Sequence, residues 1–291
     1  MRIAIYGKKF DESFQPHIQF FLDQAYHFEW EVLVFEPFLS FLKPRINFSG
    51  EVKSFKTRNQ LDNVKIIFSI GGDGTFLDTV GLIGQKKIPI VGLNTGRLGF
   101  LSNINKDDFE SCLQLLQQGA YALKERSLIQ LESSKPLFQE NNFALNEVTV
   151  HKKDSSSMIT IHTYLDGDYL NSYWADGLIV STPTGSTAYS LSCGGPILLP
   201  GSKNHIITPI APHNLNVRPV VVPDDLEIQL KIEGRGRKFL AALDSKSASF
   251  DTSLTLKIKK ADFSINLIEL EGQSFFDTLR KKMLWGIDRR N

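Results

Sequence analysis

Residues 68–76 read Phe-Ser-Ile-Gly-Gly-Asp-Gly-Thr-Phe, and this stretch decides how the first half of the chain folds. An apolar run, Val64–Ile70, ends at Gly71–Gly74, and helical spacing of apolar residues begins at about Thr75. Glycine permits a positive φ and lets a ligand approach the backbone closely. The first turn of a helix offers unpaired N–H groups and the positive end of the helix dipole. The stretch therefore predicts a strand-to-helix turn that can cradle a phosphate.

Asp73 is the unexpected residue in this turn. A carboxylate repels phosphate unless a divalent cation or a reacting hydroxyl lies between them. That combination suits phosphoryl transfer, in which a carboxylate orients and deprotonates the attacking hydroxyl. The alternative is a plain turn in which Asp73 caps the helix. The turn has no lysine for a Walker A loop and does not match the GxGxxG dinucleotide fingerprint.

The segments around this turn alternate between short apolar runs and helix-length amphipathic stretches. The spacing predicts strands at residues 3–6, 30–35, 64–70 and 88–93, and helices at 13–28, 76–84 and 106–118. This βαβ rhythm predicts a mostly parallel, doubly wound sheet with helices on both faces.

The pattern changes beyond about residue 125. Period-two alternation runs through residues 226–232, 254–258 and 263–267, and more loosely through 159–164, which predicts antiparallel strands with one face on a core. Helical spacing returns at 275–285. We expect two domains, an α/β domain at 1–105 and a β-rich domain at 106–271, with a C-terminal helix within 272–291 packing back on the first.

Two polar segments of the second half could hold a ligand. Asn146 and Glu147 precede a predicted strand at 148–151, where they could clasp a sugar diol or an adenine edge or simply form a polar strand end. Residues 176–192 run from Asp176 through an apolar strand into a loop rich in small hydroxyls, Thr184 and Thr187 among them, and then to Tyr189. Hydroxyls and one aromatic face suit a polar ligand with a stackable base, although a Ser/Thr-rich turn is the simpler alternative.

In this order after Gly71–Thr75, the Asn-Glu pair and the run Asp176–Tyr189 closely resemble bacterial NAD kinases, within the superfamily that also holds diacylglycerol, sphingosine and 6-phosphofructokinases. The resemblance continues through Thr208–His213, Arg218-Pro219, Asp244-Ser245 and the terminal 275–285, so it covers nearly the whole chain. It implies a C-terminal β-sandwich-like domain and transfer of the γ-phosphate of ATP to the 2′-hydroxyl of the adenosine ribose of NAD. We expect the active site in a cleft between the two domains.

The resemblance also implies roles for individual residues. Asp73 would accept the proton of the 2′-hydroxyl, Asn146 and Glu147 would hold a ribose, and Asp176 would contact the nicotinamide end. The predicted nucleotide-binding residues are Asp73, Gly74, Asn146, Glu147, Asp176, Thr184, Thr187, Ala188, Tyr189, Ser190, Leu191, Ser192, Ala211 and Lys246. Four positions, Asp78, Ser157, Trp174 and Lys246, depart from relatives, and they bear on peripheral contacts and on the preference between NAD and NADH. A divalent cation, Mg²⁺ by expectation, would be bound mainly through ATP phosphates, with no protein metal site.

Composition limits the other partners. Lysine and arginine number 33 against 32 for aspartate and glutamate, so neither nucleic acid nor an anionic membrane is expected. Two cysteines without metal-ligand or disulfide patterns suit a reducing cytoplasm, and we find no signal peptide and no apolar run long enough to cross a membrane. The resemblance suggests a homodimer or homotetramer. Another kinase of the superfamily, acting on a lipid or a sugar, and a non-catalytic NAD-binding sensor remain as alternatives.

Overall fold

The computed structural model describes residues 1–138, 141–153, 157–236 and 238–285. The contacts divide the chain into two compact units. The first holds Met1–Glu125 together with the chain from Ile265 on, and the second holds Arg126–Ser264.

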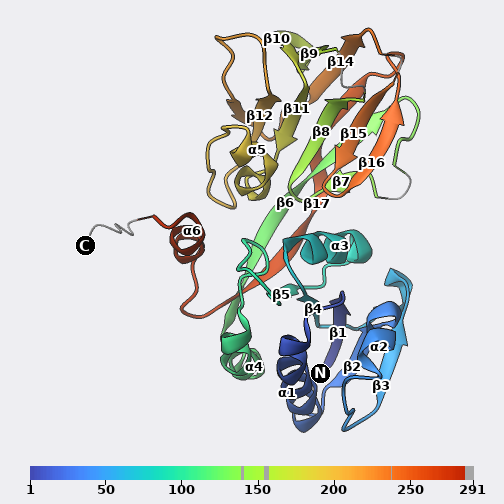
Figure 1. Cartoon of the computed structure of the whole chain (residues 1–291), viewed down its shortest axis with the longest axis vertical. Helices are drawn as coiled ribbons and strands as arrows, with labels where there is room; N and C mark the ends of the chain where they lie inside the picture. Colours follow the sequence, from blue (N-terminus) through green and yellow to red (C-terminus); the bar gives the residue numbers. More distant parts are fainter. Residues whose placement is uncertain (139–140, 154–156, 237, 286–291) are drawn as a thin grey trace. The chain divides into compact units, whose positions relative to one another are not determined.

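The first unit is built on a parallel sheet (Figure 1). Its strands lie in the order β5-β4-β1-β2-β3, and the register pairs Ile5 of β1 with Phe68 of β4. The end of β17 adds to this sheet in parallel, with Leu267 opposite Ile90. The bounds of the strands are β1 Arg2–Gly7, β2 Glu31–Phe35, β3 Val52–Phe55, β4 Ile66–Ile70, β5 Ile90–Leu93 and β17 Leu256–Leu270.

Helices cover both faces of this sheet. The ring of Phe21 on α1 (Gln15–His27) lies 4.8 Å from that of Phe68. The next residue, Ser69, accepts a 2.9 Å hydrogen bond from Thr79 on α3 (Asp73–Ile83). Because consecutive strand residues point to opposite faces, α1 and α3 lie on opposite sides of the sheet. The doubly wound α/β fold is confirmed.

The border between the units differs from the predicted border at 105/106. α4 (Phe109–Gln118) belongs to the first unit, because its apolar side is buried in the same core as Ile5 and Phe14. Residues 265–270 also lie in this unit, as the end of β17. From the predicted tail, α6 (Phe275–Met283) belongs to the first unit, and the ring of Phe275 lies 6.4 Å from that of Phe100. Residues 286–291 of that tail lie outside the described residues.

The second unit contains two antiparallel sheets whose apolar faces share one core. One sheet has the strand order β13-β12-β11-β8-β15-β16, and β10-β9-β14 followed by the start of β17 form the other. The β-sandwich-like domain is therefore confirmed. The bounds are β6 Tyr121–Ser133, β7 Phe143–Ala144, β8 Glu147–Lys152, β9 Ile159–Leu165, β10 Asp168–Ala175, β11 Gly177–Ser181, β12 Asn204–Ile210, β13 Val220–Pro223, β14 Ile228–Gly234, β15 Phe239–Leu243 and β16 Lys246–Phe250.

Three details of the secondary structure differ from the prediction. The separate strands predicted at 254–258 and 263–267 are one long strand, β17, which starts in the second unit and ends in the first. The helix predicted at 76–84 begins at Asp73. A short helix, α2 (Glu36–Leu42), was not predicted.

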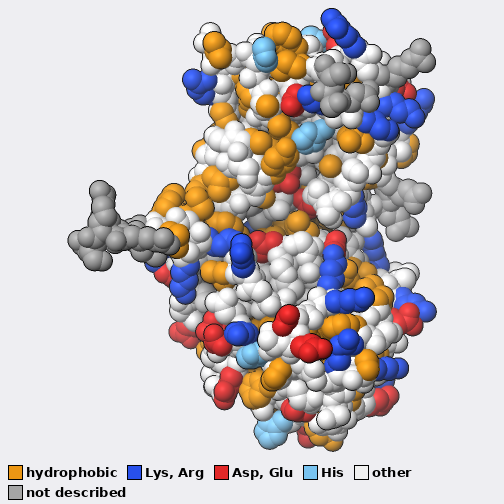
Figure 2. All heavy atoms as spheres, viewed as in Figure 1, with side chains coloured by type: hydrophobic (Ala, Val, Ile, Leu, Met, Phe, Trp, Pro, Cys, Tyr) orange, Lys and Arg blue, Asp and Glu red, His pale blue; other side chains and the backbone are white. Residues whose placement is uncertain are grey.

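The visible surface mixes charges of both signs (Figure 2). Within the described residues, no helix is long and apolar enough to cross a membrane. Both cysteines, Cys112 and Cys193, are free thiols.

Candidate functional site

Asp73 is the first residue of α3, and its carboxylate turns away from the helix it begins. Gly72 occupies the N-cap position. The Asp73 carboxylate instead accepts three backbone N–H groups from a later segment: Phe100 N at 2.9 Å on Oδ2, and Leu101 N at 3.0 Å and Ser102 N at 2.9 Å on Oδ1. The helix-capping alternative is therefore wrong. A carboxylate held by three amides has a fixed orientation.

The glycines of this turn leave its backbone open. Gly71 has a φ of +153°, and a Cβ there would lie 2.3 Å from the Thr75 hydroxyl, so a side chain would collide with α3. Gly72 and Gly74 are exposed, and a Cβ added to either would meet no atom within 4 Å. The turn thus exposes bare backbone beside the N-terminus of α3, and its use as a phosphate cradle stays a prediction.

In the second unit, Asp244 holds the predicted Asn-Glu pair in place. Asp244 lies in the turn between β15 and β16, where its carboxylate accepts the backbone N–H groups of Leu145 at 2.9 Å, Asn146 at 2.9 Å and Glu147 at 3.2 Å. Burial raises the pKa of Asp244, and the three N–H donors oppose that rise. The start of β8 is consequently tied to a turn about a hundred residues later.

Glu147 is a buried carboxyl group with an altered acidity. Its side chain is buried, and Oε2 has no hydrogen-bond partner among the described residues. Burial, assisted by the negative charge of Asp244, raises the pKa of Glu147 to about 8, while the backbone amide of Tyr189 opposes the rise. An unpartnered buried acceptor next to an exposed aromatic residue suits binding of a ligand hydroxyl.

Tyr189 provides the aromatic face that the sequence predicted. It begins the short helix α5 (Tyr189–Ser192), is 38% exposed, and lies on the ring of His151 at 5.8 Å with an interplanar angle of 15°. Burial raises the pKa of Tyr189, and the charges of Cys193, Glu147 and Asp176 add to the rise. The Tyr189 amide also bonds to the Glu147 carboxyl, so Tyr189, His151 and Glu147 form one group.

The other predicted residues of this segment differ in how accessible they are. Ser190 is fully buried and its hydroxyl pairs with that of Thr208 at 2.8 Å, so its side chain serves the core. The Thr187 hydroxyl bonds to the Thr184 carbonyl at 3.3 Å. Thr184, Ala188 and Leu191 are half-buried, and Ser192 is exposed.

Asp176, Ala211 and Lys246 lie around the edges of this group. The Asp176 carboxylate forms a 2.5 Å ion pair with Lys152. Ala211 directly follows Ile210, whose carbonyl accepts the Asp176 amide at 3.0 Å, and has a left-handed φ of 45°. Lys246 is exposed at the start of β16, and its charge acts on Asp244. In the second unit, Glu147 lies opposite Ser181 and His151 lies opposite Gly177, so the Asn-Glu pair and Asp176 are at opposite ends of the β8–β11 pair. Asp73 and Gly74 form a separate group in the first unit.

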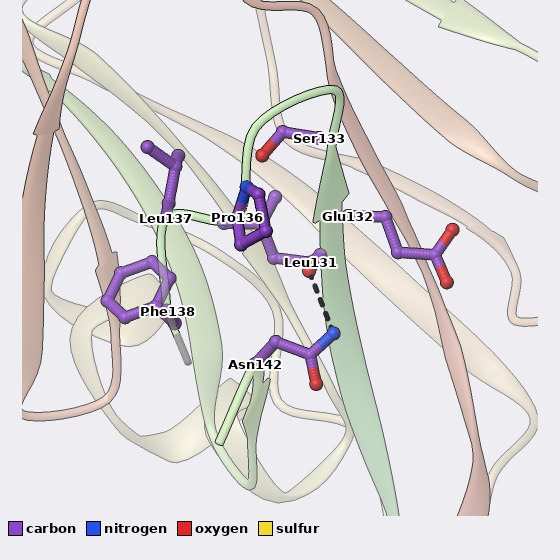
Figure 3. A pocket seen from close by; sticks show the side chains of 7 residues that line it. All are labelled: Leu131, Glu132, Ser133, Pro136, Leu137, Phe138 and Asn142. Atoms are coloured by element: carbon purple, nitrogen blue, oxygen red, sulfur yellow. Dashed lines mark hydrogen bonds between the residues drawn. The ribbon is translucent and has the colours of Figure 1, made fainter. Parts of the chain in front are cut away.

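A pocket beside the segment that follows β6 contains none of these residues (Figure 3). It is lined by Leu131, Glu132, Ser133, Pro136, Leu137, Phe138 and Asn142, and the Asn142 amide donates to the Leu131 carbonyl at 3.3 Å. The described part of the chain also holds no cluster of three His, Cys, Asp or Glu residues that could bind a metal ion.

Comparison with known proteins decides the family. The ATP-NAD kinase N-terminal domain model matches residues 8–121 and the ATP-NAD kinase C-terminal domain model matches residues 145–270. The chain belongs to the ATP-NAD kinase family.

Relatives and solved structures agree with this membership. The chain is 48% identical to a protein named NAD kinase from Cytophaga hutchinsonii and 47% identical to one from Flavobacterium johnsoniae, each over 100% of both chains. An NAD kinase from Archaeoglobus fulgidus in complex with ATP is 27% identical, with a TM-score of 0.75 over 98% of this chain and 99% of that one. Yeast NADH kinase complexed with NADH has a TM-score of 0.88 at 21% identity, covering 99% of this chain and 89% of that one, and shows the shared fold.

Sequence reasoning missed the residues that hold the site of this ATP-NAD kinase family member in place. Phe100, Leu101 and Ser102 act through backbone amides, which leave no side-chain pattern to find. Asp244 and Lys152 were visible as charges but were not assigned to the site. The signal for Asp244 was a carboxylate in a tight turn between two alternating strands, a position that surface aspartates also occupy.

Proposed function

We propose that this ATP-NAD kinase family member transfers the γ-phosphate of ATP to the 2′-hydroxyl of the adenosine ribose of NAD, giving NADP and ADP. The observation that carries the proposal is Asp73, a carboxylate held by three amides beside an open glycine turn. Full-length relatives named NAD kinase support it, as does the ATP bound to the Archaeoglobus enzyme.

Asp73 would act as the general base. The ribose hydroxyl is far too weak an acid to ionise at neutral pH, so its proton passes to the Asp73 carboxylate as the oxygen bonds to the γ-phosphorus and the bond from that phosphorus to the β–γ bridging oxygen breaks. Proton removal of this kind contributes about 10²- to 10⁴-fold, and positioning with charge neutralisation provides most of the remainder.

The second-unit residues would bind NAD. Asn146 and Glu147 would take ribose hydroxyls, since Glu147 offers the unpartnered Oε2. Tyr189 would stack against a base through the face not covered by His151. Asp176 would accept from the nicotinamide end, and Ala211 would lie against the adenine side. Thr184, Thr187, Ala188, Leu191, Ser192 and Lys246 would complete the surroundings, and Ser190 would contribute through its backbone.

The donor would bring its own divalent cation. Asp73 is a single carboxylate, and three amides already use three of its acceptor positions. We therefore propose that Mg²⁺ is held mainly by the triphosphate, whose charge it neutralises. We also propose that the protein works in the cytoplasm as a homodimer or homotetramer, which light scattering on a sizing column would test.

The test is NADP formation from NAD, ATP and Mg²⁺, followed with an NADP-specific dehydrogenase, for the wild type and Asp73→Asn. Asp62→Asn, a substitution of the same type at an exposed ion pair with Lys86, is the matched control. We expect activity in the wild type and control and loss in Asp73→Asn. NAD binding without NADP formation in the wild type would instead indicate a non-catalytic NAD sensor.

A further inference from the structure

We propose that Asn94 is a positioning residue for Asp73, acting through the segment 94–102, which we call the brace. The inference rests on the proposed role of Asp73 as the base. The three consecutive amides of Phe100, Leu101 and Ser102 hold the Asp73 carboxylate only if the backbone that carries them keeps its shape.

The Asn94 side chain fixes that shape. Asn94 follows β5 and is only 2% exposed. Its Nδ2 donates to the carbonyls of Arg97 at 2.7 Å and Ser102 at 3.1 Å, and its Oδ1 accepts the amide of Gly96 at 2.6 Å. One carboxamide thereby joins the start, the middle and the end of the brace. It uses two N–H donors and one oxygen acceptor, a combination that the side chains of aspartate and leucine lack.

Close packing presses the brace against the carboxylate. A Cβ at Gly99 would lie 2.0 Å from Asp73 Oδ1, and a Cβ at Gly92 would lie 2.5 Å from the Leu101 carbonyl oxygen. Glycine at these two positions is what allows the brace to reach Asp73 on one side and β5 on the other.

This arrangement distinguishes the two oxygens of Asp73. Oδ1 accepts two amides and Oδ2 accepts one, so the free acceptor position of the carboxylate is on Oδ2. Oδ2 is therefore the atom that would receive the proton, and the brace sets the direction in which it points. A general base needs hydrogen-bond reach of the proton that it removes, so a shift of about 1 Å can cost about 100-fold in rate.

The experiment is a double-mutant cycle of Asn94→Ala with Asp73→Asn, measuring kcat and KM for NAD. We expect Asn94→Ala to lower kcat about 10- to 100-fold while KM for NAD stays within about twofold, because the second-unit NAD residues are unchanged. In the Asp73→Asn background, Asn94→Ala should lower the residual kcat by less than about twofold, because there is no base left to orient. Asn105→Ala, in the same connection but not among the partners of Asn94 or Asp73, is the matched control.

Gly99→Ala is the second variant, in case Asn94→Ala does not fold. It adds a single methyl group against Asp73 Oδ1, so the same loss of kcat and the same dependence on Asp73 are expected. Additive losses in either cycle would overturn the positioning role, as would wild-type kcat in folded Asn94→Ala. Wild-type kcat in Asp73→Asn would overturn the base assignment itself and the inference with it, so the two failures are distinguishable.

Discussion

Replacing Asp73 by asparagine removes one charge and one acceptor, and the structure predicts how the site would respond. Asparagine keeps a single carbonyl oxygen, which is best placed at Oδ1, where Leu101 and Ser102 both donate. Its NH₂ group then faces the amide of Phe100, and two donors cannot bond to each other. The variant therefore loses the proton acceptor and one of three hydrogen bonds to the brace.

The size of each effect follows from the surroundings. A hydrogen bond to a charged group contributes about 1.5–3 kcal/mol, and because Asp73 is only half-buried, water can replace part of it, so we expect a loss of about 1–2 kcal/mol in the free energy of unfolding. That change lowers the melting temperature by a few degrees and leaves the fold intact. Loss of the base should lower kcat by about 10²- to 10⁴-fold.

Three measurements on the same samples separate these effects: kcat from NADP formation, the melting temperature, and NAD affinity by titration calorimetry. We expect a large fall in kcat with NAD affinity within about threefold of the wild type. A folded Asp73→Asn protein with kcat within about threefold of the wild type would refute the base assignment. A fall in kcat matched by loss of NAD binding would show that Asp73 binds substrate rather than removing a proton.

Three further predictions concern the second unit. Burial raises the pKa of Glu147 from 4.5 to about 8, so the folded state keeps a proton that the unfolded state releases. The free energy of unfolding should therefore fall by up to a few kcal/mol between about pH 5 and pH 8. Urea titrations should show that this pH dependence of stability disappears in Glu147→Gln. Asp244→Ala leaves three backbone amides without their acceptor and should cost several kcal/mol of stability and weaken NAD binding, whereas unchanged stability would contradict its anchoring role. Tyr189→Leu should raise KM for NAD about tenfold with kcat and KM for ATP nearly unchanged, and an equal rise in both KM values would argue against base stacking.

Periodicity in the sequence predicted the elements whose burial is regular. β4 is buried along its whole length and α4 has one apolar side, so both were found. α2 follows β2 without a break and begins at a Glu-Pro pair, so the sequence pattern did not separate the helix from the strand before it. Lys259 and Lys260 interrupt the apolar alternation, so the sequence predicted two strands where the structure has one. β17 continues through them because its two ends pack in the cores of different units.

The site was predictable only where side chains carry the chemistry. A local sequence pattern singled out the glycine turn with Asp73, the Asn-Glu pair and Tyr189. The structure then gave the burial of these residues and their place in the elements. The geometry of Asp73 was out of reach, because its partners are backbone amides 27 to 29 residues later that any amino acid except proline could supply.

Asp73 and Asp244 are held in the same way, and the difference between them indicates which one can react. Each carboxylate accepts three consecutive backbone amides, two on Oδ1 and one on Oδ2. Burial raises the pKa of Asp244, and its three amides come from the start of β8, so this carboxylate ties a turn to a core strand. Asp73 stands between the exposed residues Gly72 and Gly74, where a ligand can reach the carboxylate. Three amides therefore make a carboxylate rigid, and access to solvent and ligand decides whether that rigidity supports the fold or the reaction.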